Sequence, residues 1–287
     1  MKIADILFQA RQVLDAKGVS NSKLDSLILL SHALFLLGEN FSKEKIIFNP
    51  DLELNEEQQK SFLALIARRA KREPVSHIIG KREFFGEDFL VNSAVLDPRP
   101  DSETLIETVL KKFPNQNQQL KVLELGVGSG CLIVTLLKSY KLAQAMAVDI
   151  SKAAIEVAQK NSITHQVQDR LQIIESDLFQ TLNGGQTFDL IISNPPYIES
   201  KAIDLLQPEV KIYEPRTALD GGLDGLDFYR RIANNAKKFL SENGQIILEI
   251  GYGQESEIEK IFLENNFIFE SANRDLAGIL RVMSFKK

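Results

Sequence analysis

The sequence VLELGVGSG, residues 122–130, joins a short apolar run to a loop that contains three glycines. The apolar run has the length and composition of a buried strand, and a helix is expected to begin near Cys131. Glycines let the backbone turn sharply and approach a ligand closely, with the helix N-terminus behind the loop. A dinucleotide-binding fingerprint would carry Gly or Ala at position 131, where this chain has cysteine. The loop alone is also compatible with a simple tight turn, so the residues that follow it must decide.

Short apolar runs alternate with amphipathic stretches on both sides of this loop. The runs cover residues 122–125, 145–148, 171–174, 190–192 and 246–250. Such alternation is typical of a parallel sheet with helices on both faces. We therefore expect an α/β domain over residues 99–287.

The first 74 residues have a different pattern, in which apolar positions recur at helical spacing. Ser22, with Asp25 three positions later, is expected to cap the second helix, and Asn55 to cap a third. Arg68, Arg69, Lys71 and Arg72 gather near the end of that third helix, and we interpret them as a solvated helix end. This pattern predicts a small helical domain over residues 1–74.

A linker over residues 75–98 is expected to contain a β-hairpin. Residues 78–91 are rich in β-forming residues and contain a turn at Gly86. The stiff sequence DPRP, residues 97–100, then leads into the α/β domain.

Length, composition and charge are those of an ordinary globular protein. The chain has 287 residues, 44% hydrophobic and 25% charged, with 34 Lys and Arg against 39 Asp and Glu. This mild acidity counts against broad binding to nucleic-acid backbones. One cysteine and three dispersed histidines offer no disulfide and no recognisable zinc spacing, which favours a reducing, cytoplasmic location without a metal. The longest apolar run, residues 27–38, is shorter than the roughly 20 residues that a membrane span needs.

Acidic residues follow two successive predicted strands. Asp149 ends the second strand, where a carboxylate can meet ribose hydroxyls, and Asp177 follows the third, near the expected place of an adenine. Each acid alone is commonly a helix cap or a surface charge. Together with the glycine loop they predict an adenosine-shaped crevice, and the absence of a lysine after the loop argues against a triphosphate.

Two interpretations of Cys131 are open. Its thiol could have a lowered pKa at the start of a helix, or its side chain could pack behind the glycine loop, and we favour packing.

The tetrapeptide NPPY, residues 194–197, directly follows the fourth predicted strand. Pro195 and Pro196 fix the backbone, Asn194 adds a carbonyl acceptor and an amide donor, and Tyr197 adds a flat face. Acceptors aimed at a planar, conjugated NH2 group would favour the pyramidal nitrogen of a methyl-transfer transition state. The alternative is an ordinary proline-rich turn.

These motifs resemble those of the class I S-adenosylmethionine-dependent methyltransferases. The sequences EPVSHIIGKREFFG, DPRPDSE, NPPYI, EPRTALDGGLDGLDFYR and DLAGILRV occur in order and resemble the PrmC/HemK family, the N5-glutamine methyltransferases of peptide chain release factors. The match runs roughly from residue 72 to the end of the chain. It implies a Rossmann-like fold with a mostly parallel, seven-stranded sheet, a connecting β-hairpin and a small N-terminal helical domain. The presence of this helical module leads to the hypothesis that it docks the large protein substrate.

The resemblance also implies roles for individual residues. The methionine part of the cofactor would lie on Gly126, Val127, Gly128, Ser129 and Gly130, the ribose on Asp149, and the adenine beside Asp177 and Leu178. Asn194 would contact both cofactor and substrate, and Asn194, Pro195, Pro196 and Tyr197 would bind the glutamine side chain. Asp97 stands where an aliphatic residue is expected, and the sequence offers no reason for it.

Several alternatives stay open on the sequence alone. NPPY also suits a methyltransferase for a ribosomal-protein glutamine or for adenine N6 in nucleic acid, and the glycine loop suits a cofactor-binding module without catalysis. Residues 99–103, RPDSE, favour the release-factor branch, and the acidic charge disfavours nucleic acid. Cys131 and NPPY disfavour a nicotinamide-dependent dehydrogenase. We expect a monomer that acts on class I release factors, with no stable nucleic-acid partner and no membrane.

Overall fold

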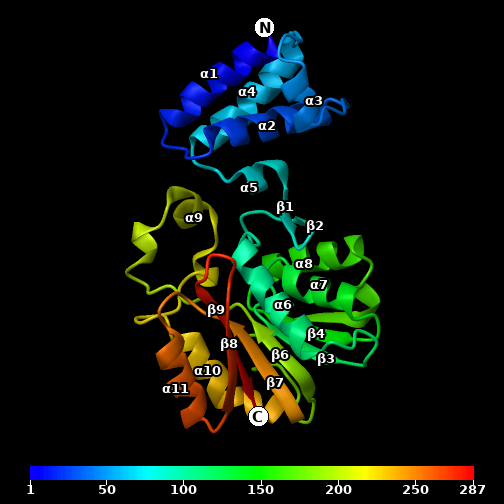
Figure 1. Ribbon diagram of the computed structural model, residues 1–287, viewed down its shortest axis with the longest axis vertical. Helices are drawn as coiled ribbons and strands as arrows, with labels where there is room; N and C mark the ends of the chain where they lie inside the picture. The colour runs from blue at the N-terminus through cyan, green and yellow to red at the C-terminus, as the bar shows by residue number, and fades with distance from the viewer. The chain divides into compact units, whose positions relative to one another are not determined.

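The computed structural model describes residues 1–287 and divides into two compact units (Figure 1). The helical unit comprises residues 1–81 together with the short segment 207–213, and the sheet unit comprises residues 82–206 and 214–287. The division thus falls at residue 81, beyond the expected end of the helical domain at residue 74. None of the helices is both long and apolar enough to cross a lipid bilayer.

The helical unit confirms the helices expected over the first seventy residues. Their apolar faces meet in one buried core that includes Ile6, Leu14, Leu30, Phe62 and Ile66. The sixth helix comes from the distant segment 207–213, so this unit is built from two separate parts of the chain. The helices are α1 (Ile3–Asp15), α2 (Ser22–Leu36), α3 (Lys43–Phe48), α4 (Glu56–Ala70), α5 (Val75–Ile79) and α9 (Pro208–Tyr213).

One of the two predicted helix caps is confirmed and the other is wrong. Asn55 forms a reciprocal capping box with Gln58 at the start of α4. The residue before α2 is Asn21, and no side chain caps that helix. Asp25 is buried instead, and its carboxylate accepts a hydrogen bond from Arg69 Nε at 2.7 Å.

The basic cluster at the end of α4 is therefore more than a solvated helix end. Arg69 is only 6% exposed, and its Nη1 atom lies 3.0 Å from Glu209 Oε1, on α9. Arg72 also contacts this carboxylate. A buried guanidinium needs such partners, because an unpaired charge away from water is costly.

The β-hairpin is confirmed, but it begins later than expected. Strands β1 (Lys81–Phe84) and β2 (Glu87–Leu90) pair as a two-stranded sheet. Both turn residues, Phe85 and Gly86, have positive φ angles, as a two-residue type I′ turn requires. Helix α5 precedes the hairpin and ends at Ile79, where Gly80 follows in a left-handed conformation that stops the helix.

The sheet unit contains the expected seven-stranded, mostly parallel sheet. Its strand order is β5-β4-β3-β6-β7-β9-β8, in which β9 runs antiparallel to β7 and β8. The other neighbouring strands are parallel. The strands are β3 (Lys121–Leu125), β4 (Gln144–Asp149), β5 (Leu171–Glu175), β6 (Phe188–Ser193), β7 (Leu240–Glu249), β8 (Ile268–Arg274) and β9 (Leu280–Lys286).

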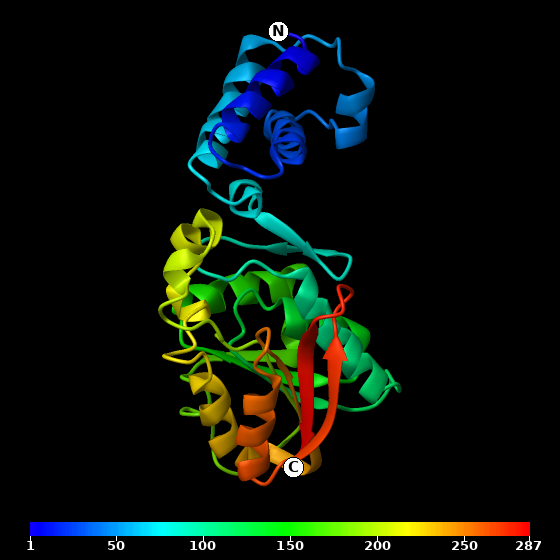
Figure 2. The ribbon, with the colours of Figure 1, turned by 60° about the vertical axis from the view of Figure 1, so that its left-hand side comes forward.

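Helices cover both faces of this sheet, as predicted (Figures 1 and 2). Leu123 and Leu125 face a core shared with α10 and α11, whereas Val122 faces the core beneath α6 and α7. This alternation along β3 follows from the two-residue period of a strand. The helices are α6 (Glu103–Lys112), α7 (Cys131–Ser139), α8 (Lys152–Thr164), α10 (Asp227–Ala236) and α11 (Glu255–Glu264).

The strand order reverses between β3 and β6. The chain builds β3, β4 and β5 outward in one direction and then returns to place β6 on the other side of β3. The loops after β3 and β6 run in opposite directions, and a crevice therefore opens between them at the carboxyl edge of the sheet. Such folds bind their ligands in this crevice.

Candidate active site

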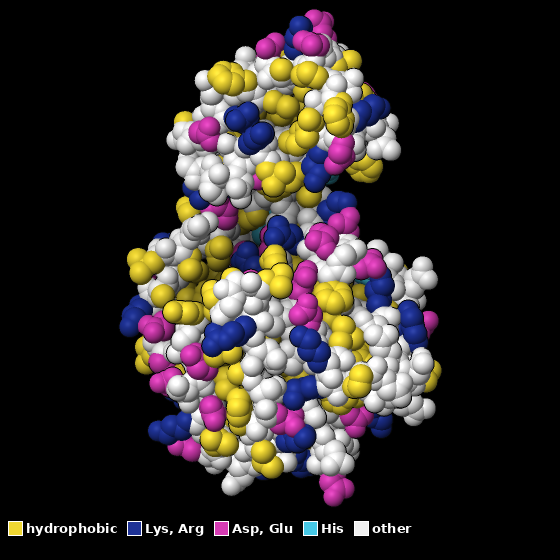
Figure 3. Space-filling view, in the orientation of Figure 1, with side chains coloured by type: hydrophobic (Ala, Val, Ile, Leu, Met, Phe, Trp, Pro, Cys, Tyr) yellow, Lys and Arg dark blue, Asp and Glu magenta, His cyan; other side chains and the backbone are white.

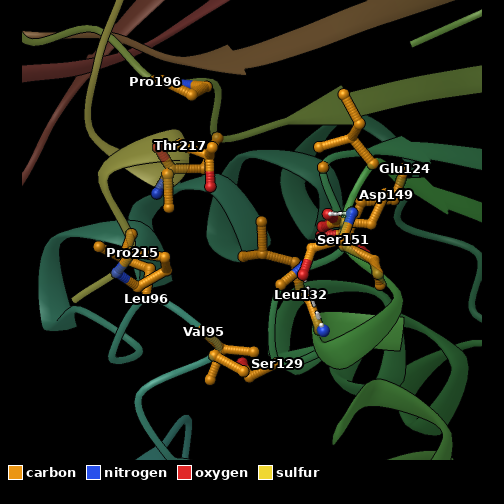
Figure 4. A pocket seen from close by; sticks show the side chains of 18 of the residues that line it. Val95, Leu96, Glu124, Ser129, Leu132, Asp149, Ser151, Pro196, Pro215 and Thr217 are labelled. Atoms are coloured by element: carbon orange, nitrogen blue, oxygen red, sulfur yellow. Dashed lines mark hydrogen bonds between the residues drawn. The ribbon is translucent and has the colours of Figure 1, made fainter. Parts of the chain in front are cut away.

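A cavity of about 460 Å³ opens at this reversal of strand order, within the sheet unit. Its volume falls within the roughly 300–1,000 Å³ typical of small-molecule sites. Loops after β3, β4, β5 and β6 line it, together with residues 94–99 and 215–218. In Figure 4, Glu124, Asp149 and Ser151 lie on one side of the cavity, and Pro215 and Thr217 lie across from them.

The glycine loop is held against the neighbouring strand and helix. The N–H groups of Gly126 and Val127 both donate to the carbonyl of Val148, at 2.8 and 2.9 Å. Gly128 adopts a φ of 51°, and Gly130 a φ of 80°, at the start of α7. A Cβ atom on Gly130 would lie 3.2 Å from the Cβ of Ala158 on α8, so glycine is what lets this turn pack closely.

Asp149 ties the end of β4 to the glycine loop. Its Oδ2 atom accepts from the N–H of Gly128 and its Oδ1 atom accepts from the N–H of Ser151, each at 2.9 Å. Ser151 in turn caps α8, as predicted. The Asp149 carboxylate lines the cavity, and each oxygen keeps a further lone pair for a ligand hydroxyl.

Asp177 and Leu178 lie on the wall after β5. Leu178 is buried with a φ of 52°, and its carbonyl accepts from Ser176 Oγ at 2.8 Å. Asp177 Oδ1 forms an ion pair with Arg231 Nη2 at 2.6 Å, and both side chains line the cavity. Arg231 comes from α10, and no local feature of the sequence linked it to the site.

The NPPY corner begins beside the end of β3, because Ser193 Oγ donates to the carbonyl of Leu125 at 2.7 Å. Asn194 Nδ2 donates to Ser102 Oγ at 3.1 Å, and both residues line the cavity. Tyr197 points its hydroxyl toward Glu249, with 3.4 Å between the Oη and Oε1 atoms. Burial, followed by the charge of Glu249, raises the pKa of Tyr197 well above its usual value.

The loop EPRTALDGGLDG, residues 214–225, packs against this corner. The Ile198 N–H donates to Leu219 O, and the Gly221 N–H donates back to Ile198 O. A Cβ atom on Gly221 would lie 2.8 Å from the carbonyl oxygen of Pro196 and from the Cα of Tyr197. The two chain segments can therefore approach this closely only because residue 221 is glycine.

Glu124 is a site residue that the sequence reasoning missed. It is 1% exposed, it lines the cavity, and its Oε2 atom has no hydrogen-bond partner. Burial raises its pKa well above the ordinary glutamate value, and nearby Asp149 adds to the rise. Its signal in the sequence was a carboxylate among the apolar residues of β3. A cationic ligand beside it would offset the cost of burying its charge.

The cavity brings together most of the residues predicted from the sequence. These are Gly126, Val127, Gly128, Ser129, Asp149, Asp177, Leu178, Asn194 and Pro196. Gly130, Pro195 and Tyr197 lie outside its wall, while Ser102, Glu124, Arg231 and residues 215–218 belong to the wall and were not predicted.

Two unexplained residues also line the cavity. Burial raises the pKa of Cys131 to about 12, so the lowered pKa considered for this thiol is wrong. Asp97 is buried in the wall, which gives this residue a place beside the ligand site.

Two family models match the chain. Residues 99–222 match the Methyltransferase small domain, and residues 5–80 match the PrmC N-terminal domain. A methyltransferase from Pyrococcus furiosus shares the fold, with a TM-score of 0.54 and 17% identity over 77% of this chain and 98% of that one.

Relatives cover nearly the whole chain. It is 43% identical to the release factor glutamine methyltransferase of Geobacter sulfurreducens, over 98% of this chain and 95% of the relative. It is also 40% identical to the bifunctional methyltransferase of Rickettsia felis, over 99% of this chain. The chain spans only about half the length of the bifunctional relatives, 58% in Rickettsia felis and 51% in Rickettsia bellii.

The cofactor of this methyltransferase fold is S-adenosylmethionine, and the residues of the cavity fit it. The glycine loop gives the close backbone approach that the methionine part needs, and the buried, unpartnered Glu124 oxygen suits an ammonium group. Fold, family models and full-length relatives agree, and the chain belongs to the PrmC/HemK family of release factor glutamine methyltransferases.

Proposed function

We propose that this protein transfers a methyl group from S-adenosylmethionine to the side-chain nitrogen, N5, of the glutamine in the GGQ motif of class I peptide chain release factors. The observation that carries the proposal is that Asn194 and Pro196 line the same cavity as the glycine loop. An amide-binding corner and a cofactor loop then share one space. The 43% identity to a full-length release factor glutamine methyltransferase supports this choice of substrate.

The proposed cofactor site uses the wall on the β3, β4 and β5 side. The backbone from Gly126 to Gly130 approaches the methionine part, and Glu124 accepts from its ammonium group. Asp149 accepts from the ribose hydroxyls, with lone pairs that its bonds to Gly128 and Ser151 leave free. Leu178 packs on the adenine, and Asp177, held by Arg231, accepts from its amino group.

The proposed substrate site uses the NPPY corner. Asn194 holds the glutamine amide by hydrogen bonds, Pro195 and Pro196 keep the backbone of the corner rigid, and Tyr197 stands beside it. Acceptors at the NH2 group favour the nitrogen as it becomes pyramidal and positively charged. A charged or bulky side chain would not satisfy this corner.

S-adenosylmethionine supplies an already activated methyl group, so the protein's contribution is alignment. Holding two reactants in line can lower a barrier by about 7–11 kcal/mol. The corner contains no strong general base, because Asn194 does not ionise and the pKa of Tyr197 is raised. The proton therefore leaves after transfer, to water or to a carbonyl oxygen.

The proposal extends to partners and location. The helical domain, residues 1–74, would dock the release factor, and the protein would act as a monomer in the cytoplasm, where translation ends. On the face shown in Figure 3, Lys and Arg side chains of the sheet unit are interspersed with Asp and Glu. This mixture suits a protein partner better than a nucleic acid.

Labelled cofactor tests the proposal directly. Purified protein is incubated with release factor, with ribosomal proteins or with nucleic acid, and we expect label in release factor. Asn194→Ala should keep most of its affinity for S-adenosylhomocysteine and lose methylation. Full turnover by this variant would contradict the role of Asn194, and label in adenine would favour a nucleic-acid methyltransferase.

A further inference from the structure

A buried carboxylate lies directly behind the NPPY corner. Glu249 ends β7 and is 1% exposed. Its Oε2 atom accepts from Ser102 Oγ at 2.5 Å, and its Oε1 atom faces the Tyr197 hydroxyl at 3.4 Å. Ser102 Oγ in turn accepts a hydrogen bond from the side-chain NH2 group of Asn194. A hydrogen-bonded chain thus connects Glu249, through one hydroxyl group, to the side chain proposed to hold the substrate.

The chemistry of this chain decides which end of the Asn194 amide faces the cavity. An ionised carboxylate can only accept, so the single Ser102 proton points toward Glu249. The Ser102 oxygen is then left to accept, and Asn194 must present its NH2 group to it, at 3.1 Å. The carbonyl oxygen of Asn194 is therefore free for the cavity.

We infer that Glu249 is a positioning residue for methyl transfer, which acts through Ser102 to hold the Asn194 carbonyl toward the NH2 group of the substrate glutamine. This inference rests on the proposed function. It gives a reason for the hydroxyl at position 102 and for a buried acid that touches no ligand itself. With the amide of Asn194 reversed, two NH2 groups would face each other and the substrate would lose an acceptor.

The surroundings of Glu249 make its charge sensitive to pH. Burial raises its pKa to about 7, while the bond from Ser102 and the positive charge of Arg281 oppose that rise. Asp101 adds a repulsive charge, although it also pairs with Arg281 at 2.8 Å. Arg281 is held on its other side by Asp275, at 3.0 Å.

The remaining polar neighbours of Glu249 are neutral. The Tyr229 hydroxyl donates to the Glu249 main-chain carbonyl at 2.9 Å and does not compete for the carboxylate. The pKa values of Tyr197, Tyr229 and Cys131 are all raised by burial, so these groups stay protonated near neutral pH. Protonation of Glu249 would free the Ser102 proton to point at Asn194 and would let the amide turn.

Steady-state kinetics with full-length release factor test the inference. Glu249→Gln and Ser102→Ala should each lower kcat, by on the order of 10- to 100-fold, as expected when a group near the chemistry is misplaced. Affinity for S-adenosylhomocysteine should change much less than kcat, because Glu249 lies outside the cavity wall and Ser102 acts through Asn194. Ser102→Thr keeps the hydroxyl and should retain most of the activity. The double variant should be no worse than either single one, because both break the same chain.

The pH profile adds a readout that a purely structural role would not move. The kcat of the natural sequence should fall on the acid side, with a midpoint near pH 7, and Glu249→Gln should lose this dependence. A Glu249→Gln variant with normal kcat and an unchanged acid limb would overturn the inference. So would full activity in Ser102→Ala, or additive losses in the double variant.

A substrate-free measurement separates this inference from the proposed function. The side-chain NH2 signals of Asn194, identified in ¹⁵N NMR spectra by their loss in Asn194→Asp, should shift as the pH crosses 7, and Glu249→Gln should abolish the shift. If the unaltered protein failed to methylate release factor, the proposed function would fall while these spectra still decided the orientation of Asn194. Asn194 NH2 signals that do not shift with pH would contradict the hydrogen-bonded chain from Glu249 through Ser102 to Asn194.

Discussion

Arg72 donates from Nε and Nη2 to the two carboxylate oxygens of Glu209, at 2.7 and 2.5 Å, across 137 positions of the sequence. Tyr213, at the end of the same segment, donates its hydroxyl to Lys71 O at 2.9 Å. These contacts fasten residues 207–213 to the helical unit, although the chain enters and leaves this segment from the sheet unit. The returning chain then supplies residues 215–218 to the cavity wall. The segment is a covalent link between the helical unit and the site.

Replacing Glu209 by Gln should destabilise the helical unit. Burial opposes the charge of Glu209, but hydrogen bonds from Arg72 and Arg69 keep its pKa below the usual value. Losing these charged bonds should lower the free energy of unfolding by about 1–3 kcal/mol, measured by chemical denaturation. The effect should be complete above pH 4.5 and be lost as the pH falls through the lowered pKa that Glu209 has in the folded protein.

The matched control for this pair is Asp51→Asn, which breaks the exposed ion pair with Lys2 in the same unit. Exposed pairs contribute little, so this variant should unfold like the unaltered protein. Equal effects of Glu209→Gln and Asp51→Asn would argue that the Arg72 contact is not an anchor.

Gly221→Ala should displace the NPPY corner. The added Cβ would lie 2.8 Å from both Pro196 O and Tyr197 Cα, so one backbone must move. A shift of about 1 Å at a reacting group can cost on the order of 100-fold in rate, and we expect kcat/KM to fall by that order. Gly184→Ala is the control, because no atom lies within 4 Å of its Cβ and its φ is not positive. Normal kinetics in Gly221→Ala would show that the loop does not hold the corner.

Asn161→Ala should loosen both the hairpin and the glycine loop. Asn161 is fully buried on α8 and exchanges hydrogen bonds with both backbone groups of Leu90, at 2.8 and 3.0 Å. Its Nδ2 atom also donates to Ser129 O at 2.8 Å. Leaving these buried groups unpaired should cost about 2–4 kcal/mol of stability and weaken S-adenosylhomocysteine binding in titration calorimetry. Thr164→Ala, on the exposed side of the same helix, controls for helix propensity, and a loss as large there would refute the special role of Asn161.

Glu249→Gln should make the protein more stable than the natural sequence at alkaline pH. The pKa of Glu249 rises from 4.5 to about 7 on folding, so its favourable contribution to stability is complete below pH 4.5 and is lost as the pH rises through 7. The difference between the two proteins should therefore change by on the order of 3 kcal/mol between pH 4.5 and 8. Denaturation at both pH values measures it, with the exposed Glu242→Gln as the background for losing one carboxylate. An unchanged difference would mean that Glu249 is not penalised by burial.

The fold was predictable where its signals are local. Residues 122–131 place most of a strand, three glycines and the start of a helix within ten positions, and each of the first five strands of the sheet unit contains an apolar run. Strands β8 and β9 contain no such run, because polar residues interrupt their apolar positions, as Glu270, Ser271 and Asn273 do in Ile268–Arg274. Only the resemblance implied a seven-stranded sheet.

The site was predictable only in part, for the same reason. Gly128 and Asp149 belong to short motifs, and their contact follows from neighbouring parallel strands. Ser102 and Glu249 are 147 positions apart, and nothing local indicates that they meet. The prediction that Ser22 caps a helix was wrong for a related reason. The local pattern resembles a capping box, but the Asp25 carboxylate pairs with Arg69, which is distant in the sequence.

Mass spectrometry of release factor tests the central claim most directly. Full-length release factor is incubated with the purified protein and S-adenosylmethionine, digested and sequenced by fragmentation. We predict one added methyl group on the side-chain amide of the glutamine in the GGQ motif, and none with Asn194→Ala. An unmodified GGQ peptide, in a reaction where ribosomal protein or nucleic acid gains the methyl group, would contradict the account.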